Sequence, residues 1–240
     1  MDYYNSSSLF FHLRKSHKFS EKRARFYAAQ LLMSMSHLHE PNIAYRELKL
    51  DNILMDDKGF IALTDFRLSK ENVDVPDGTK TFCGTAEYIA PELLKRLPYG
   101  KAVDWWGFGT LLYEMMTGQT PFFDRNRKRM FHTFYTATWS FSEDAKDILT
   151  GLLQRDPAKR LGSGPSGVQE IMDHPVDFEK LLKREVEPPF KPVVNSEADM
   201  GNVVNIFTRK MSRDSPVTQE LGATHRAQAH FDGFTYKSGN

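Results

Sequence analysis

The sequence predicts a mainly α-helical domain that carries one small β-hairpin and continues into an extended C-terminal tail. Three features support this fold class. Apolar residues recur every three or four positions after Ser20, two short alternating runs flank the turn 56–59, and a polar, proline-containing stretch with little periodicity follows Glu187. These patterns are typical of an amphipathic helix, a hairpin and an irregular tail.

The first long helix is expected to begin after Ser20, because a serine hydroxyl can cap a helix N-terminus. It should end before Pro41, since proline does not continue a helix. Its apolar face consists of Ala24, Tyr27, Ala28, Leu31, Leu32, Met35 and Leu38.

The hairpin follows this helix, with strands expected over 53–55 and 61–64 and the turn Asp-Asp-Lys-Gly between them. The next stretch, 69–81, is polar and contains Pro76 and Asp77-Gly78, so it predicts a long exposed loop. Loops of this length in compact domains often carry function.

Further helices complete the predicted domain. Residues 103–117 are apolar almost all round and precede Gly118, which indicates an enclosed helix at the centre of the core. Ser142 precedes two acids and predicts a helix through Leu153. Short helices are expected over 168–172 and 178–183.

Composition excludes several classes of protein. The 240 residues include 32 Lys+Arg and 31 Asp+Glu, a formal net charge of +1, which does not suit a nucleic-acid binder that neutralises phosphates. The single Cys83 excludes an internal disulfide, and the most apolar segment, 103–116, is interrupted by Asp104 and Glu114. We expect a protein of a reducing compartment, cytoplasmic or nuclear, without a membrane span.

The hairpin also suggests where chemistry takes place. Asn52 precedes its first strand and Asp65 follows its second strand, so the returning chain brings an amide and a carboxylate to one place. Oxygen ligands of these two kinds can hold Mg²⁺ on a nucleotide phosphate.

Several segments occur in a fixed order along the chain. They are YRELKLDN at 45–52, TDFR at 64–67, TFCGTAEYIAPE at 81–92, DWWG at 104–107, PPFKP at 188–192, Ser215-Pro216, and FDGFTY at 231–236. Together they resemble the signature of protein kinases, and more closely that of the AGC group of serine/threonine kinases, near its Akt, serum/glucocorticoid-regulated and fungal Ypk-type members.

The resemblance implies a domain organisation. Residues 1–183 correspond to the kinase C-lobe, and residues 184–240 to the AGC tail with its turn and hydrophobic motifs. Residues 1–4 resemble the segment just after the hinge between the lobes, so the N-lobe with its glycine-rich loop is expected to be absent from this chain.

The resemblance also implies the roles of individual side chains around ATP and Mg²⁺. The implied catalytic set is Glu47, Lys49, Asn52, Asp65 and Thr85, in which Asn52 and Asp65 are the metal ligands. Further contacts to the cofactor would come from Leu54, Thr64 and Ser8.

Protein partners follow from the same resemblance. Asp51 and Glu114 would attract basic residues that precede the target Ser or Thr of a protein substrate. An upstream kinase would phosphorylate the chain at Thr81, Ser215 and Thr235, and the phosphate on Thr81 would be received by Arg46 and Lys70. Glu92 with Arg160, and Asp104, have structural roles in the family.

Three positions depart from the family pattern. Glu47 replaces the Asp that accepts the substrate proton and lengthens it by about one methylene. Arg67 replaces the Gly of the metal-binding triplet, and it either pairs with Asp65 and competes with Mg²⁺ or points into solvent. Ser8 stands where an acid normally meets the ribose.

The family reaction is transfer of the γ-phosphoryl group of ATP to Ser or Thr of proteins. The departures and the missing lobe predict that this chain is catalytically impaired or inactive on its own. Two alternatives stay open. The chain is a non-catalytic module that competes with an intact relative for activators or substrates, or it is a gene-model fragment of an active kinase.

Overall fold

The computed structural model describes residues 4, 7–73, 78–121, 141–173 and 178–194 of the chain, with no side-chain detail at 178 and 179. The predicted phosphorylation sites Ser215 and Thr235 and the hydrophobic motif at 231–236 lie outside these residues.

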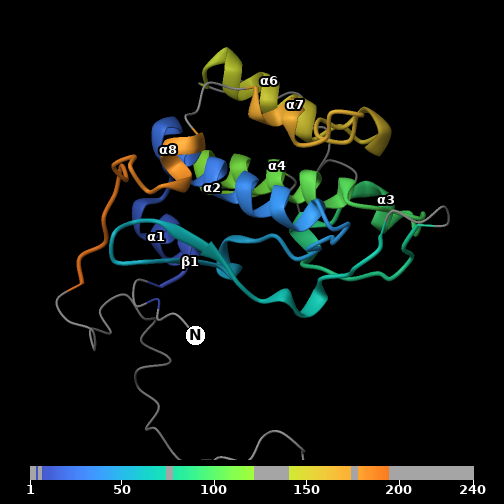
Figure 1. Cartoon of the computed structure of the whole chain (residues 1–240), viewed down its shortest axis with the longest axis horizontal. Helices are drawn as coiled ribbons and strands as arrows, with labels where there is room; N and C mark the ends of the chain where they lie inside the picture. The colour runs from blue at the N-terminus through green and yellow to red at the C-terminus, as the bar shows by residue number, and fades with distance from the viewer. Residues whose placement is uncertain (1–3, 5–6, 74–77, 122–140, 174–177, 195–240) are drawn as a thin grey trace, which may run out of the picture. The chain divides into compact units, whose positions relative to one another are not determined.

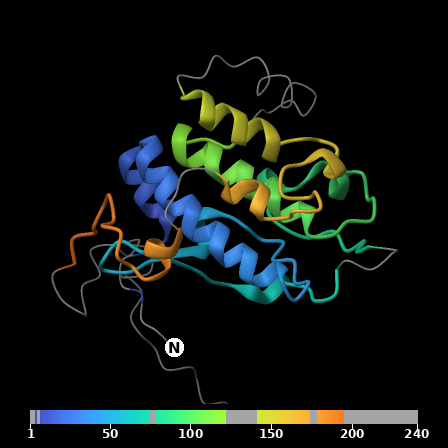
Figure 2. The same cartoon turned by 45° about the horizontal axis from the view of Figure 1, so that its top comes forward.

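The described residues form a mainly helical fold with one two-stranded sheet. In chain order the elements are α1 (Leu9–Ser16), α2 (Glu21–His39), β1 (Ile53–Met55), β2 (Ile61–Leu63), α3 (Pro91–Leu94), α4 (Ala102–Thr117), α6 (Glu143–Leu152), α7 (Gln169–Met172) and α8 (Phe178–Leu182). Figures 1 and 2 show α4 between α2 and α6, with the hairpin on the other side of α2.

Helix α4 is the centre of the core, as the sequence predicts. Its aromatic and aliphatic side chains are buried on every side, including Trp105, Trp106, Phe108, Leu111 and Met115. The helix ends at Gly118, whose φ of 82° is left-handed. A Cβ at Gly118 would lie 2.2 Å from the carbonyl oxygen of His17, so only glycine fits this close approach.

Helix α2 and the hairpin also confirm their predictions. The Ser20 hydroxyl accepts the backbone N–H of Arg23 at 3.3 Å and caps α2. The strands pair antiparallel, with Ile53 opposite Leu63 and Met55 opposite Ile61. The predicted helices over 142–153, 168–172 and 178–183 are present as α6, α7 and α8, with ends that differ by one residue.

Two α-helices in the described part of the chain were not expected from the sequence. Helix α1 begins after Ser8, whose hydroxyl accepts the N–H of Phe11 at 3.4 Å, and it buries Leu9 and Leu13. Its signal was present, because a serine precedes apolar residues at helical spacing. Helix α3 spans four residues and begins with Pro91 at its first position, where a missing N–H costs no hydrogen bond.

The beginning of the proline-containing stretch packs against the helices. The guanidinium of Arg23 lies 3.9 Å from the ring centre of Phe19 and 3.8 Å from that of Phe190. Stacking of a cation between two aromatic rings is favourable, particularly when it is shielded from water. Residues 188–194 contain no helix or strand, in agreement with an irregular segment.

No helix among the described residues is long and apolar enough to cross a membrane.

A buried ion pair joins α3 to the C-terminal half of the fold. The guanidinium of Arg160 donates to both carboxylate oxygens of Glu92, at 2.7 and 2.9 Å, and also to the carbonyls of Ala102 and Gln154. Both side chains of the pair are almost completely buried. Every polar atom of the carboxylate therefore has a partner that compensates for lost water.

Removal of one member of the buried Glu92–Arg160 pair should lower the stability of the fold. Glu92→Ala leaves a buried, unpaired guanidinium, and we expect the free energy of unfolding to fall by about 3–5 kcal/mol. Glu143→Ala breaks the exposed pair of Glu143 with Lys146, also 2.7 Å long, and should cost less than about 1 kcal/mol. Urea denaturation of both variants measures the difference, and equal losses would contradict the structural role of the buried pair.

Candidate active site

The loop that carries most of the predicted site residues is held by one buried carboxylate. Asp104 on α4 accepts the backbone N–H groups of Tyr45 and Arg46, each at 2.8 Å, and it contacts Nε2 of His39 at 2.8 Å. Only 1% of Asp104 is exposed. Arg46 has a φ of 66°, an unusual value for a non-glycine residue, which the two bonds to Asp104 help to hold.

A second set of bonds closes the loop onto the hairpin. The Tyr45 hydroxyl donates to the carbonyl of Thr64 at 2.5 Å, and both the N–H and the hydroxyl of Thr64 donate to the carbonyl of Asn52 at 2.9 Å. The Asn52 amide donates to the carbonyl of Glu47 at 3.1 Å. The two ends of the hairpin therefore meet, as the spacing of Asn52 and Asp65 predicts. Burial raises the pKa of Tyr45, so its hydroxyl keeps its proton at neutral pH.

Three members of the predicted catalytic set, Glu47, Lys49 and Thr85, lie together. The Lys49 ammonium donates to the Glu47 carboxylate at 2.8 Å and to the Thr85 hydroxyl at 3.3 Å. All three side chains are partly exposed, so a ligand can reach them. The cation links a carboxylate from the loop to a hydroxyl that is 36 residues further along the chain.

Arg67 pairs with Asp65, which decides between the two orientations left open by the sequence. The guanidinium donates from Nε and Nη2 to the two carboxylate oxygens at 2.6 and 2.7 Å. Its hydrogen bond to Asp65 is the main cause that lowers the pKa of that carboxyl. Asp65 itself adopts a left-handed backbone, with φ of 58°. Each carboxylate oxygen that could bind a metal ion therefore already accepts one hydrogen bond from Arg67.

An acidic surface lies beside the site. The Tyr88 hydroxyl donates to the Glu114 carboxylate, and the charges of Asp51 and Glu87 also act on Glu114. Burial is the largest cause that raises the pKa of Glu114 to about 7, opposed by the Tyr88 hydrogen bond and increased by the two neighbouring acids. Asp51 and Glu114 were predicted from the sequence. Tyr88 and Glu87 were not predicted, although both lie within the quoted segment 81–92.

Thr81, a predicted phosphorylation site, is connected to Arg46 through Tyr99. The Arg46 guanidinium donates to the carbonyl of Leu68 at 2.7 Å and to the Tyr99 hydroxyl at 2.9 Å. That hydroxyl donates in turn to the carbonyl of Thr81 at 2.6 Å. The backbone of Lys70 pairs with the backbone of Ala44, which is the residue before Tyr45. Sequence reasoning missed Tyr99, because a contact between such distant segments leaves no local pattern.

The remaining predicted cofactor residues border the first strand. Ser8 and Leu54 form an isolated antiparallel bridge, and Leu54 is half-buried. The Ser8 oxygen already accepts the N–H of Phe11 as the cap of α1. Its hydroxyl proton is the group left to donate to a ligand.

Comparisons with known proteins agree with this architecture. The family model of the protein kinase domain matches residues 1–176 of the sequence. Protein kinase 2 of Dictyostelium discoideum is 44% identical over 98% of this chain and 50% of its own length. RAC-beta serine/threonine-protein kinase of Homo sapiens is 40% identical over 99% of this chain and 52% of its own length. Serine/threonine-protein kinase YPK1 of Saccharomyces cerevisiae is 45% identical over 97% of this chain and 35% of its own length.

The chain belongs to the protein kinase family. Within that family its relatives place it in the AGC group of serine/threonine kinases, as the sequence motifs predict. The chain spans about half the length of the first two relatives and about a third of the last.

The raised pKa of Glu114 predicts a pH effect on stability. The folded state holds this proton up to about pH 7, against an ordinary value of 4.5. The stabilising contribution of the proton is therefore complete below pH 4.5 and is lost as the pH rises through 7. Glu114→Gln should be increasingly stable relative to the wild type across this range, by at most about 1.4 kcal/mol per pH unit.

Urea denaturation at several pH values between 5 and 8 measures this difference. Glu143→Gln serves as the control, because it replaces an exposed carboxyl on another helix. A Glu114→Gln difference that is no more dependent on pH than the Glu143→Gln difference would contradict the proposed protonation of Glu114.

Proposed function

We propose that this chain is the C-lobe of an AGC-type kinase, with residues 1–183 as the lobe and 184–240 as the tail, and that its phosphoryl-transfer activity is impaired. The family reaction would move the γ-phosphoryl group of ATP to Ser or Thr of a protein. The observation that carries the proposed impairment is the two-bond contact of Arg67 with Asp65.

The donor atoms are of the kind that Mg²⁺ prefers, but they are not equally available. The Asn52 amide donates its N–H to Glu47, which leaves its oxygen for a ligand. Each oxygen of Asp65 already accepts one hydrogen bond from Arg67, so a metal ion would compete with that cation for the carboxylate. When bound, Mg²⁺ would neutralise charge on the phosphates of ATP. Since 82% of the Arg67 side chain is exposed, water already competes for the pair, so metal binding should be weakened rather than abolished.

Glu47 would accept the proton of the substrate hydroxyl. Its carboxylate has suitable chemistry and is oriented by Lys49 at 2.8 Å. The extra methylene displaces it relative to an aspartate, and a misplacement of about 1 Å can lower a rate by about 10²-fold. Lys49 and Thr85 would hold the transferred phosphate beside it.

The acidic surface supports a second, non-catalytic function. Asp51 and Glu87 are exposed next to Glu114, so they present negative charge to a peptide that carries basic residues. This surface needs no metal ion, and Arg67 does not contact it in the described bonds. A chain that binds substrates in this way without phosphorylating them would compete with an intact relative.

The metal-binding part of the proposal predicts a gain of function. Arg67→Gly frees both oxygens of Asp65 and should tighten binding of Mn²⁺, used as a paramagnetic substitute for Mg²⁺, by several-fold in the presence of ATP. Water-proton relaxation measures the affinity. Arg184→Gly removes another exposed arginine that contacts an aspartate, Asp56, and should leave Mn²⁺ binding unchanged. Unchanged binding in Arg67→Gly would contradict competition by Arg67.

The catalytic part of the proposal predicts restored transfer. The double variant Glu47→Asp with Arg67→Gly should phosphorylate a basic serine peptide at least about tenfold faster than the wild-type chain, because the base and the metal ligand return to the family geometry. Transfer of radioactive phosphate from ATP measures the rate, and Asp65→Ala in the same background should abolish it.

Measurable wild-type activity that equals the activity of the double variant would overturn the proposed impairment. If both chains are silent, yet the basic peptide binds and Asp51→Asn weakens that binding, the non-catalytic function is the correct one.

A further inference from the structure

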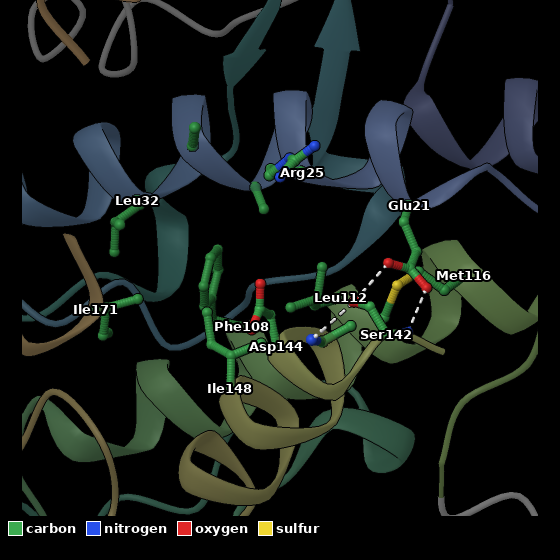
Figure 3. A pocket seen from close by; sticks show the side chains of 13 residues that line it. Glu21, Arg25, Leu32, Phe108, Leu112, Met116, Ser142, Asp144, Ile148 and Ile171 are labelled. Carbon is green, nitrogen blue, oxygen red and sulfur yellow. Dashed lines mark hydrogen bonds between the residues drawn. The ribbon is translucent and has the colours of Figure 1, made fainter. Parts of the chain in front are cut away.

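A hollow away from the candidate active site is enclosed by α2, α4 and α6. Its volume is about 740 Å³, a figure that includes open solvent at the mouth. Figure 3 shows side chains from α2 on one side and from α4 and α6 on the other. Most of the wall is apolar and includes Ala28, Leu32, Phe108, Leu112, Ile148 and Ile171.

The polar side chains of the hollow differ in how they are bonded. Both carboxylate oxygens of Glu21 are used, because they accept the N–H and the hydroxyl of Ser142 at 2.8 Å each. This contact joins the starts of α2 and α6 and closes one end of the hollow (Figure 3). Glu21 therefore has a structural partner and needs no ligand.

Asp144 is available in a way that Glu21 is not. It lies in the first turn of α6, and its carboxylate has no hydrogen bond or ion pair with any residue that the structure describes. Figure 3 shows the carboxylate directed toward the space between Phe108 and Leu112. With Glu21 and the exposed Arg25 of α2, the charged groups of the hollow carry a net charge of −1.

The chemistry of this lining selects a ligand class. An apolar wall favours an apolar body, since burial is worth about 25 cal/mol per Å² of apolar surface. Asp144 is exposed, so its carboxylate stays hydrated beside a neutral ligand, whereas a protonated amine can pair with it. A carboxylate ligand would be repelled by the net negative charge.

We propose that the hollow between α2, α4 and α6 is a binding site for a small amphiphile with an apolar body and a protonated amine, which pairs with Asp144. The amine donates to the Asp144 carboxylate, and the apolar body lies against Phe108, Leu112 and Ile148. This site does not depend on phosphoryl transfer, because none of its lining residues belongs to the proposed catalytic set.

Three ligands with one apolar body and different head groups test the proposal. They are 4-phenylbutylamine, 4-phenylbutanol and 4-phenylbutyrate, titrated into the full 240-residue chain at pH 7 and low salt. Chemical-shift titration by NMR gives the affinities. The amine should bind tightest and the carboxylate weakest, and the preference for the amine should decrease when salt is added.

Variants then assign the contact. Asp144→Asn should weaken binding of the amine about fivefold, the upper range for an exposed ion pair, and leave the alcohol unchanged. Asp147→Asn is the matched control, because Asp147 is exposed on the same helix and does not line the hollow. Arg25→Gln should have the opposite effect to Asp144→Asn and strengthen amine binding. Ala28→Trp fills the hollow and should abolish binding of all three ligands.

Circular dichroism of each variant shows that it is folded before its affinity is compared. Absence of binding by all three ligands to the wild-type chain would overturn the site. Equal affinity for amine and carboxylate, or equal loss in Asp144→Asn and Asp147→Asn, would overturn the assignment of Asp144 and leave that residue with a purely structural place at the start of α6.

Discussion

The candidate active site depends on one buried carboxylate, that of Asp104. It lies on α4, the most enclosed helix of the fold, and accepts two successive N–H groups of the loop at Tyr45 and Arg46. Two further contacts of the site begin from these residues, because the Tyr45 hydroxyl donates to Thr64 and the Arg46 guanidinium donates to Tyr99. The apolar core thus fixes the position of a polar loop, which a loop at the surface could not achieve alone.

Glu47 and Arg67, two positions at which this chain departs from its family, belong to the same site. Thr64 bonds to Asn52 at the base of the hairpin, and the next residue, Asp65, has a left-handed backbone and contacts Arg67. Glu47 stands beside Lys49 with its longer side chain. The proposed impairment therefore depends on metal binding at Asp65 and proton transfer at Glu47, whereas the proposed binding of basic peptides depends on the acidic surface around Glu114.

Much of the fold could be predicted because its signals are local. The period of α2, the turn of the hairpin and the Gly118 end of α4 each follow from a few neighbouring residues. Helix α1 was missed because it is short, and Ser8 was assigned to a cofactor rather than to a cap. For Arg67 the sequence left two orientations, and the structure shows the one that contacts Asp65. The contact of Tyr99 with Thr81 and the hollow beside Asp144 join distant segments, and these leave no periodic pattern.

Native-state amide hydrogen exchange tests the role of Asp104 most directly. If the two bonds to its carboxylate hold the loop, the amides of Tyr45 and Arg46 should exchange as slowly as those in the middle of α4, because both would open only when the core unfolds. Asp104→Asn should accelerate these two amides far more than those of α2. Exchange of Tyr45 and Arg46 at the rate of an exposed loop in the wild-type chain would contradict this account of the site.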